Sequence, residues 1–241
     1  MLVARGLHVT LPRMKKAIRF PVCLAVCTLL TVACSPVRQI RPLDKGESRV
    51  SLSAGGPITQ VGKIYIPLPL ISLGYNYGLM ENLDVEAGIH VTDMLYGVLK
   101  VDAGVNWRPL VPPLYSPGII ISPRLFGMTD FSPGSSRLYP ELGLTGYWDF
   151  KKYRYAYIGI DNWIEYHTTR VDGNPQTNHW LIAPYAGVSL GNRLWQGQLE
   201  VMVYTPNLSN QGRPVKNIGF GKYGIIGVFL GVSRSFGGSR E

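Results

Sequence analysis

Apolar and polar residues alternate almost without a break over two successive segments between Leu83 and Trp107. The apolar residues take every second position: Leu83, Val85, Ala87, Ile89 and Val91, then Leu99, Val101, Ala103, Val105 and Trp107. The positions between them are charged, polar or glycine. A period of two is the repeat of a β-strand, whose successive side chains point to opposite faces. We therefore predict two strands, each with one apolar and one polar face.

Similar segments recur from Ser48 onward, bounded by clusters of Gly, Pro, Asn, Asp and Ser, and predict about ten strands. They are Ser48–Gly55, Ile64–Tyr77, Leu83–Val91, Gly97–Trp107, Gly118–Met128, Leu138–Trp148, Tyr153–Tyr166, His179–Leu190, Trp195–Tyr204 and Tyr223–Phe236. A total of eight or twelve strands is the alternative, because the first segment is weakly patterned and Pro67 and Pro69 interrupt the second. No segment of helical length shows a 3.6-residue apolar period, so the predicted fold is all-β.

The N-terminal residues form a predicted export signal. Met14, Lys15, Lys16 and Arg19 precede the apolar run Phe20–Val32. That run is shorter than the roughly 20 residues of a membrane-spanning helix and fits a signal-peptide core. We predict a signal peptide over residues 1–33, with the true start at Met14. Its removal leaves a single cysteine, so the exported chain has no disulfide and no cysteine-ligated metal site.

The residues around the predicted cleavage point, Leu30–Ser35, resemble the lipobox of bacterial lipoproteins, with Thr31 where that family usually has leucine. The resemblance implies lipidation of Cys34, which becomes the new N-terminus. Ordinary cleavage after Ala33 is the alternative. The residue after the cysteine is Ser35 rather than aspartate. In this respect the chain is similar to lipoproteins that are sorted onward to the outer membrane. Residues 34–47 are rich in Pro, Arg, Lys and Gly without periodicity, which predicts a flexible tether.

Short turns join some predicted strands and longer polar loops join others, in alternation along the chain. The hairpins Gly78–Trp107 and Gly191–Tyr204 and the terminal strand Tyr223–Phe236 resemble those of small bacterial outer-membrane β-barrels. The resemblance implies an antiparallel up-and-down transmembrane β-barrel over residues 48–236, followed by a tail, 237–241. It also implies an outer-membrane location with a periplasmic N-terminus, contact with membrane lipid, and use of the barrel-insertion and lipoprotein-sorting machinery.

The two faces of the strands suit a membrane barrel if the apolar face meets lipid, whereas a soluble lipocalin-like barrel has the reverse order. Aromatic residues at the strand ends of the apolar face favour the membrane barrel, because Tyr and Trp prefer membrane interfaces. These predicted girdle residues are Tyr77, Trp107, Trp148, Trp195 and Phe236 at the short-turn end, and Tyr166 and Trp180 at the other.

The polar face predicts a network that fills the lumen. Its members are Asp84, Glu86, His90, Lys100, Asp102, Arg124, Glu141, Asp161, Glu165 and Glu200. A ten-stranded barrel is narrow enough for side chains largely to fill it, so buried charges must pair with one another. We expect the carboxylates to gather around Lys100 and Arg124.

Sequence features for a specific activity are scarce. Without the signal, 19 basic residues stand against 15 acidic ones, too slight an excess to indicate nucleic-acid binding. The remaining histidines are His90, His167 and His179, and Ser189 lies too far along its strand from His179 to be activated by it. We predict no enzyme, cofactor or metal, with a lipid A acylase or deacylase as the alternative.

Three functions therefore remain open. The first is a lipid-anchored outer-membrane barrel with a structural or interaction role and a protein partner that the sequence does not identify. The second is a small-solute channel or binding barrel. The third is a soluble periplasmic lipocalin-like lipoprotein that binds an apolar ligand.

Overall fold

The computed structural model describes residues 38–109, 116–131, 135–169, 175–211 and 215–237. The predicted signal peptide, Cys34 with the three residues after it, and residues 238–241 of the predicted tail lie outside the described residues. The description that follows concerns the compact unit that begins at Cys34.

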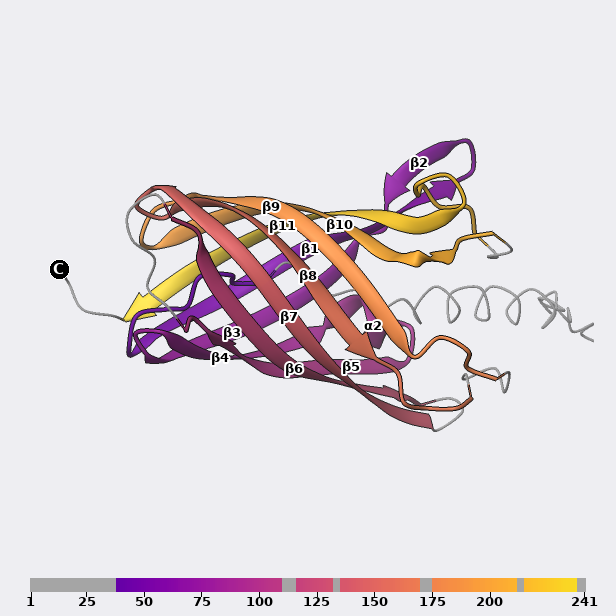
Figure 1. The fold of residues 1–241 in the computed structure, drawn as a ribbon, viewed down its shortest axis with the longest axis horizontal. Helices are drawn as coiled ribbons and strands as arrows, with labels where there is room; N and C mark the ends of the chain where they lie inside the picture. Colours follow the sequence, from indigo (N-terminus) through magenta and orange to yellow (C-terminus); the bar gives the residue numbers. More distant parts are fainter. Residues whose placement is uncertain (1–37, 110–115, 132–134, 170–174, 212–214, 238–241) are drawn as a thin grey trace, which may run out of the picture. The chain divides into compact units, whose positions relative to one another are not determined.

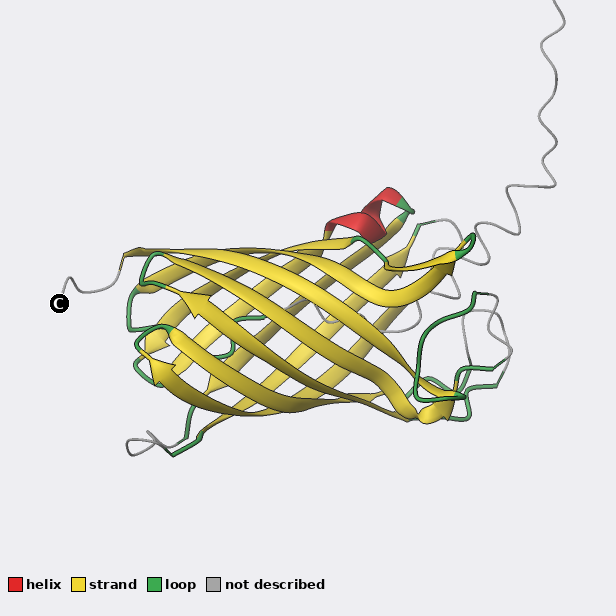
Figure 2. Cartoon of the chain, turned by 90° about the horizontal axis from the view of Figure 1, so that it is seen from above, coloured by secondary structure: helices red, strands yellow, loops and turns green. Residues whose placement is uncertain are grey.

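Ten antiparallel strands form a closed β-barrel, which confirms the predicted fold class (Figures 1 and 2). β1 pairs with β3, each strand from β3 to β10 pairs with the next one in the chain, and β11 pairs with β1 to close the barrel. A short strand, β2, extends the sheet beside β1. The strands are β1 (Glu47–Val61), β2 (Ile64–Pro67), β3 (Leu70–Met80), β4 (Leu83–His90), β5 (Val98–Trp107), β6 (Gly118–Asp130), β7 (Ser135–Lys151), β8 (Arg154–Ile164), β9 (Trp180–Gly191), β10 (Trp195–Ser209) and β11 (Tyr223–Gly237).

Two local features differ from the sequence prediction. The predicted strand Ile64–Tyr77 is broken into β2 and β3 at Leu68 and Pro69, because proline cannot donate a ladder hydrogen bond. The connection between β4 and β5 contains a single helical turn, α2 (Val91–Leu95). Among the described residues, no helix is long and apolar enough to cross a membrane.

The connections differ between the two ends of the barrel. Short turns join β3 to β4, β7 to β8 and β9 to β10 at one end, as predicted. The opposite end carries α2, the β1–β2 hairpin and the long connections from β8 to β9 and from β10 to β11. We call these the short-turn end and the long-loop end.

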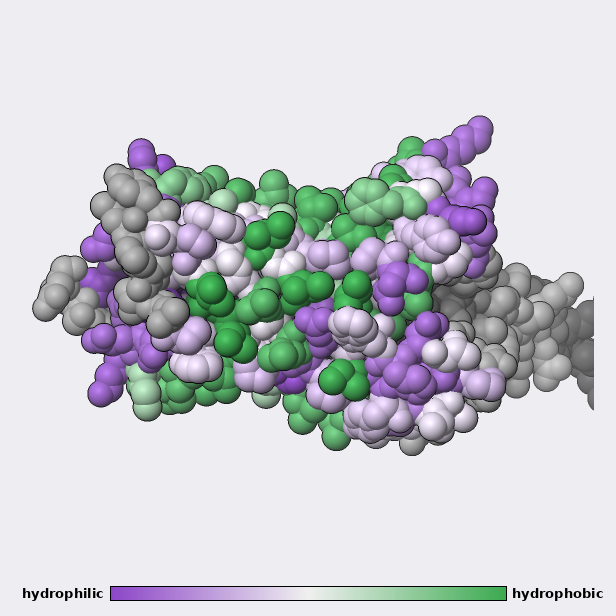
Figure 3. All heavy atoms as spheres, in the orientation of Figure 1, coloured by the Kyte–Doolittle hydropathy of each residue, from purple (hydrophilic) through white to green (hydrophobic). Residues whose placement is uncertain are grey.

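The apolar face of the strands points outward and the polar face inward. Ile158 and Leu230 are 56% and 62% exposed on the outer surface, whereas Asp84 and Asp102 are 0% and 4% exposed. Figure 3 shows hydrophobic residues over the central part of one face of the barrel and hydrophilic residues gathered toward its ends. An apolar-ligand barrel of the lipocalin kind requires the opposite arrangement, so this alternative does not fit the structure.

The segment before β1 corrects one prediction. Residues 38–46 do not form a tether outside the fold, because Arg38, Gln39, Ile40 and Leu43 are buried inside the barrel. The backbone N–H of Leu43 donates to the Asp84 carboxylate at 3.2 Å. The segment reaches β1 at the short-turn end, where the N–H of Gly46 donates to the carbonyl of Gly78. We call residues 38–46 the lumen segment.

Candidate functional site

Six charged side chains meet in the middle of the lumen. We call them the central ion cluster: Arg38, Glu86, Asp102, Arg124, Glu141 and Asp161. Five come from β4 to β8 and face inward because each lies on the polar phase of its strand. Arg38 alone comes from the lumen segment. All six are buried, so their charges interact with little screening by water.

Arg124 is the hub of the cluster on the barrel wall. Its Nε donates to Glu86 in a short contact, and its Nη1 lies 2.7 Å from Glu141 Oε1 and 3.5 Å from Asp161 Oδ1. A guanidinium group presents five donors in a fixed plane and can therefore bind several carboxylates at once. Arg124 thus connects strands β4, β6, β7 and β8 across the interior.

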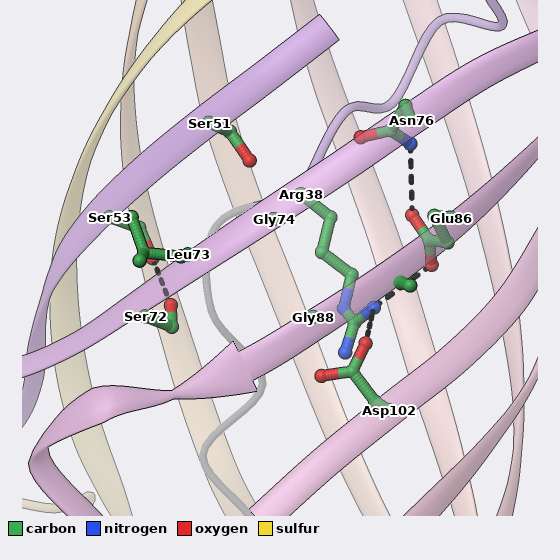
Figure 4. Close-up of a pocket in the computed structure, with 11 residues that line it drawn as sticks. Arg38, Ser51, Ser53, Ser72, Leu73, Gly74, Asn76, Glu86, Gly88 and Asp102 are labelled. Carbon is green, nitrogen blue, oxygen red and sulfur yellow. Dashed lines mark hydrogen bonds and ion pairs between the residues drawn. The ribbon is translucent and has the colours of Figure 1, made fainter.

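Arg38 is the second basic group of the cluster. Its Nη1 lies 2.9 Å from Glu86 Oε1 and 2.7 Å from Asp102 Oδ1 (Figure 4). Its guanidinium carbon stands 5.0 Å from the centre of the Phe126 ring, close enough for a cation–π interaction. Glu86 therefore bridges the two arginines, one from the wall and one from the lumen segment.

Asparagine side chains bind carboxylate oxygens of Glu86 and Asp84 toward the short-turn end. Asn106 Nδ2 donates to Asp84 at 2.8 Å and to Glu86 at 3.0 Å, and Asn76 Nδ2 donates to Glu86 at 3.4 Å. Ser122 donates in turn to the Asn106 carbonyl oxygen at 2.7 Å. Buried polar groups require such partners, and this chain of amides extends the cluster along the lumen.

His90 and Lys100 lie on the side of the cluster toward the long-loop end. His90 Nε2 is 3.0 Å from Asp102 Oδ2, and its Nδ1 is 3.8 Å from Asp93 of α2. The Lys100 ammonium stands 5.8 Å from the centre of the Phe126 ring, on which Arg38 also packs.

Two of the predicted lumen residues belong to separate groups. Glu165 lies beyond the end of β8, with His167 Nδ1 at 2.7 Å and Arg137 Nη1 at 3.9 Å. Glu200 accepts a hydrogen bond from the Tyr157 hydroxyl at 3.0 Å. The structure therefore buries all ten predicted residues but distributes them over more than one group.

Several buried polar residues on or beside this network were not among the predicted site residues, among them Arg38, Arg49, Asn76 and Asn106. Asn76 and Asn106 lie on the polar phase of β3 and β5, so the alternation pattern could have identified them. Arg49 pairs with Glu47 at 3.1 Å on β1, the strand whose pattern was weakest. No sequence signal marked Arg38, because its partners lie 48 and 64 residues away.

Large and small side chains occupy opposite parts of the lumen wall. Tyr147, Tyr155, Tyr157, Trp163 and Tyr185 are buried on strands β7 to β9. Strands β1, β3 and β4 instead present Ser51, Ser53, Ser72, Gly74 and Gly88 beside Arg38 (Figure 4). The cavity among these small residues measures about 20 Å³, which is room for about one water molecule. The lumen segment occupies this less crowded side of the interior.

The predicted girdle residues are all exposed on the outer surface. They are Tyr77, Trp107, Trp148, Trp195, Phe236, Tyr166 and Trp180. The guanidinium of Arg234, which interrupts the apolar phase of β11, packs on the rings of Trp195 and Phe236 at 5.3 and 5.1 Å. An arginine at the edge of an apolar belt can direct its charge toward water while its stem covers apolar surface.

A closed barrel with apolar side chains outside and paired charges inside belongs to the class of transmembrane β-barrels. No protein-family model matches the sequence, and no curated protein matches it significantly. Among solved structures, the chain is similar to the transport unit of the autotransporter AIDA-I from Escherichia coli, with 12% identity, a TM-score of 0.43 and coverage of 89% of this chain and 98% of that one. It is also similar to the translocator domain of the autotransporter NalP from Neisseria meningitidis, with 10% identity, a TM-score of 0.41 and coverage of 91% and 98%.

Proposed function

We propose that this protein is an outer-membrane β-barrel lipoprotein, closed to solutes, with a structural or interaction role. The single observation that carries the proposal is the filling of the lumen. The central ion cluster crosses it, the tyrosines of β7 to β9 fill one side, and the lumen segment fills the other. A conducting pore requires a continuous water-filled path, and the cavity beside Arg38 has room for about one water molecule.

Lipidation of Cys34 is compatible with the position of the lumen segment. The carbonyl of Arg38 accepts a hydrogen bond from Gln198, which lies three positions into β10 from Trp195 at the short-turn end. The segment joins β1 at this same end, which the proposal places in the periplasm, the side on which a lipidated Cys34 would be anchored.

The proposed route to the membrane uses two kinds of machinery. The lipoprotein-sorting machinery would carry the acylated chain, and Ser35 after the cysteine suits delivery to the outer membrane. The barrel-insertion machinery would recognise β11, whose outward residues Val228, Leu230, Val232 and Phe236 precede the end of the strand.

The long-loop end offers an ordered surface for interaction. The hairpin of β1 and β2 continues beyond the pairing of β1 with β3, and residues 216–218 bind its edge. The N–H of Gln60 donates to the carbonyl of Lys216 at 2.8 Å, and the N–H of Ile218 donates to Ile58 at 3.0 Å. The hairpin and residues 216–222 together carry exposed apolar residues and lysines: Ile64, Tyr65, Phe220, Lys63, Lys216 and Lys222.

The proposal includes no enzymatic activity. The hydroxyl of Ser189 donates a hydrogen bond to Gln196 Oε1 at 3.4 Å and not to a histidine. A lipid A acylase or deacylase would change the lipid A of cells that express it, and we expect the lipid A mass spectrum to stay the same.

Reconstitution of the full-length lipoprotein in planar bilayers tests the proposal. We expect no ion conductance above that of the protein-free bilayer, and stepwise currents from the unmodified protein would contradict the closed lumen. Extraction of membranes with carbonate and urea tests integration separately. The Cys34→Ala variant should stay in the membrane pellet, because the barrel holds it without the lipid. Its release into the supernatant would contradict a membrane-spanning barrel.

A further inference from the structure

The contacts of Arg38 have the composition of a guanidinium-binding site. Two carboxylates, Glu86 and Asp102, accept hydrogen bonds from the same nitrogen, Arg38 Nη1, at 2.9 and 2.7 Å. The Phe126 ring lies against it at 5.0 Å. Carboxylate acceptors and an aromatic face are the groups that bind guanidinium most strongly. All three of these residues come from the barrel wall, so the site is complete without the lumen segment.

The lumen segment is held differently from the strands that surround it. The strands pair through continuous ladders, such as the eight residue pairs between β1 and β3. The lumen segment instead binds the wall through separate contacts, among them Gln198 to the Arg38 carbonyl at 3.0 Å and Leu43 to Asp84 at 3.2 Å. Its withdrawal would leave every ladder of the barrel in place.

The wall beside Arg38 is shaped to receive a side chain. Gly88 lies directly opposite Asp102 in the pairing of β4 with β5. A Cβ atom at Gly88 would come within 2.7 Å of Asp102 Oδ2, so a larger residue would displace the carboxylate that binds Arg38. Gly74, Ser53 and Ser72 continue this small-residue wall along β1 and β3 (Figure 4).

The charge of the wall also favours a cation at this position. The central ion cluster contains four carboxyl groups and two arginines. Without Arg38, the cluster would keep its four carboxyl groups but only one arginine, Arg124. Carboxylates that line a lumen select cations over anions.

We propose that Glu86, Asp102 and Phe126 form a guanidinium-binding site whose resident ligand is the chain's own Arg38, and that the barrel passes small cations when residues 38–43 are withdrawn. The proposal goes beyond the closed barrel of the proposed function. It predicts that an arginine-bearing peptide competes for the vacated site and that the wall, rather than the segment, sets the ion selectivity.

Planar-bilayer recording of a variant that lacks residues 38–43 tests the proposal. Heat-modifiable migration on a gel first shows that the variant is folded. We expect conductance where the full-length protein has none, and a reversal potential in a tenfold KCl gradient that favours K⁺. A synthetic peptide of residues 38–44 should block the current. The same peptide with Arg38→Gln should need at least a tenfold higher concentration, because both charge-assisted hydrogen bonds are lost.

Three results for a folded deletion variant would overturn the inference: no conductance, a reversal potential that favours chloride, or equal block by the two peptides. If the deletion prevents folding, Arg38→Ser in the full-length chain tests the guanidinium site by itself, because it removes the guanidinium group and leaves the rest of the lumen segment in place. Guanidinium ions at millimolar concentration should raise the unfolding temperature of this variant, whereas urea, a neutral molecule of similar shape, should not. Equal effects of the two compounds would overturn the inference. Conductance of the unmodified protein would instead contradict the proposed function.

Discussion

The phenol ring of Tyr185 on β9 lies across Gly159, its direct partner on β8, inside the barrel. The two residues are paired in the ladder, and a Cβ atom at Gly159 would come within 2.5 Å of the Tyr185 ring. The ring in turn places its hydroxyl 2.5 Å from Thr145 on β7. Tyr157 and Gly187 repeat the arrangement between the same two strands. Glycines thus make room for the tyrosines that fill this side of the lumen.

Replacement of Gly159 by alanine should destabilise the barrel. The added methyl group displaces the Tyr185 ring and disturbs its hydrogen bond to Thr145, and overpacking of this kind costs about 1–3 kcal/mol. Gly197→Ala is the matched control, because the nearest neighbour of a Cβ at that outward position is 3.8 Å away. Urea unfolding in detergent micelles measures both. Equal unfolding midpoints for the two variants would contradict the close packing of Tyr185 on Gly159.

Loss of Arg124 should be the most damaging single change in the lumen. Arg124→Met leaves Glu86, Glu141 and Asp161 without their shared partner, and breaking a buried ion pair from one side costs about 3–5 kcal/mol. The comparison is Arg41→Met, which removes a half-exposed pair with Asp149 and should cost at most about 1 kcal/mol. The free energy of unfolding in micelles distinguishes the two. Similar losses would show that the central ion cluster is not the main electrostatic support of the interior.

The alternation between Leu83 and Trp107 was sufficient to predict β4 and β5 and their inward and outward faces. The reason is physical: lipid on one side and paired charges on the other leave little freedom at any position. The same alternation, in all the strands, identified the ten predicted lumen residues. It could not predict which of these side chains form ion pairs with one another, because that depends on which strands lie opposite one another across the barrel.

The lumen segment shows where sequence reasoning fails in a barrel of this kind. A buried segment in a soluble protein is apolar, whereas a segment inside a polar lumen is polar. Arg38, Gln39 and Arg41 therefore look like residues of a solvated linker. The end of β1 is a similar case, because Gly55-Gly56-Pro57 resembles a turn although the strand continues through it to Val61. The single turn of α2 is too short to show a helical period.

A charge on the outer wall should be costly only within the apolar belt. Leu142 is exposed near the middle of β7, and Leu142→Arg should destabilise the barrel by about 2–4 kcal/mol in lipid. Ile64 is also exposed, but it lies on β2 at the long-loop end, and Ile64→Arg should have little effect. Unfolding in lipid vesicles gives both values. A harmless Leu142→Arg would mean that water, rather than lipid, surrounds the strand.

The stacked group Trp195, Arg234 and Phe236 should contribute modestly to stability at the short-turn end. Arg234→Ala removes two cation–π contacts, each worth about 0.5–1 kcal/mol at an exposed site. Arg234→Lys keeps the charge and should retain most of the effect, whereas Arg234→Gln should not. Unfolding midpoints of the three variants test this order. A lysine variant as weak as the glutamine variant would show that planarity, rather than charge, matters.

The central claim is that hydrocarbon surrounds the barrel and charges lie within it, and spin-label accessibility tests it most directly. In a chain refolded without residues 1–33 and carrying Cys34→Ala, no native cysteine remains, and labels at Ile158→Cys on the outer face and Thr145→Cys in the lumen are compared in lipid vesicles. The structure predicts that the Ile158 label collides readily with oxygen, which concentrates in lipid, and is shielded from a water-soluble nickel chelate, while the Thr145 label is shielded from both. An Ile158 label that collides mainly with the nickel chelate would contradict the account.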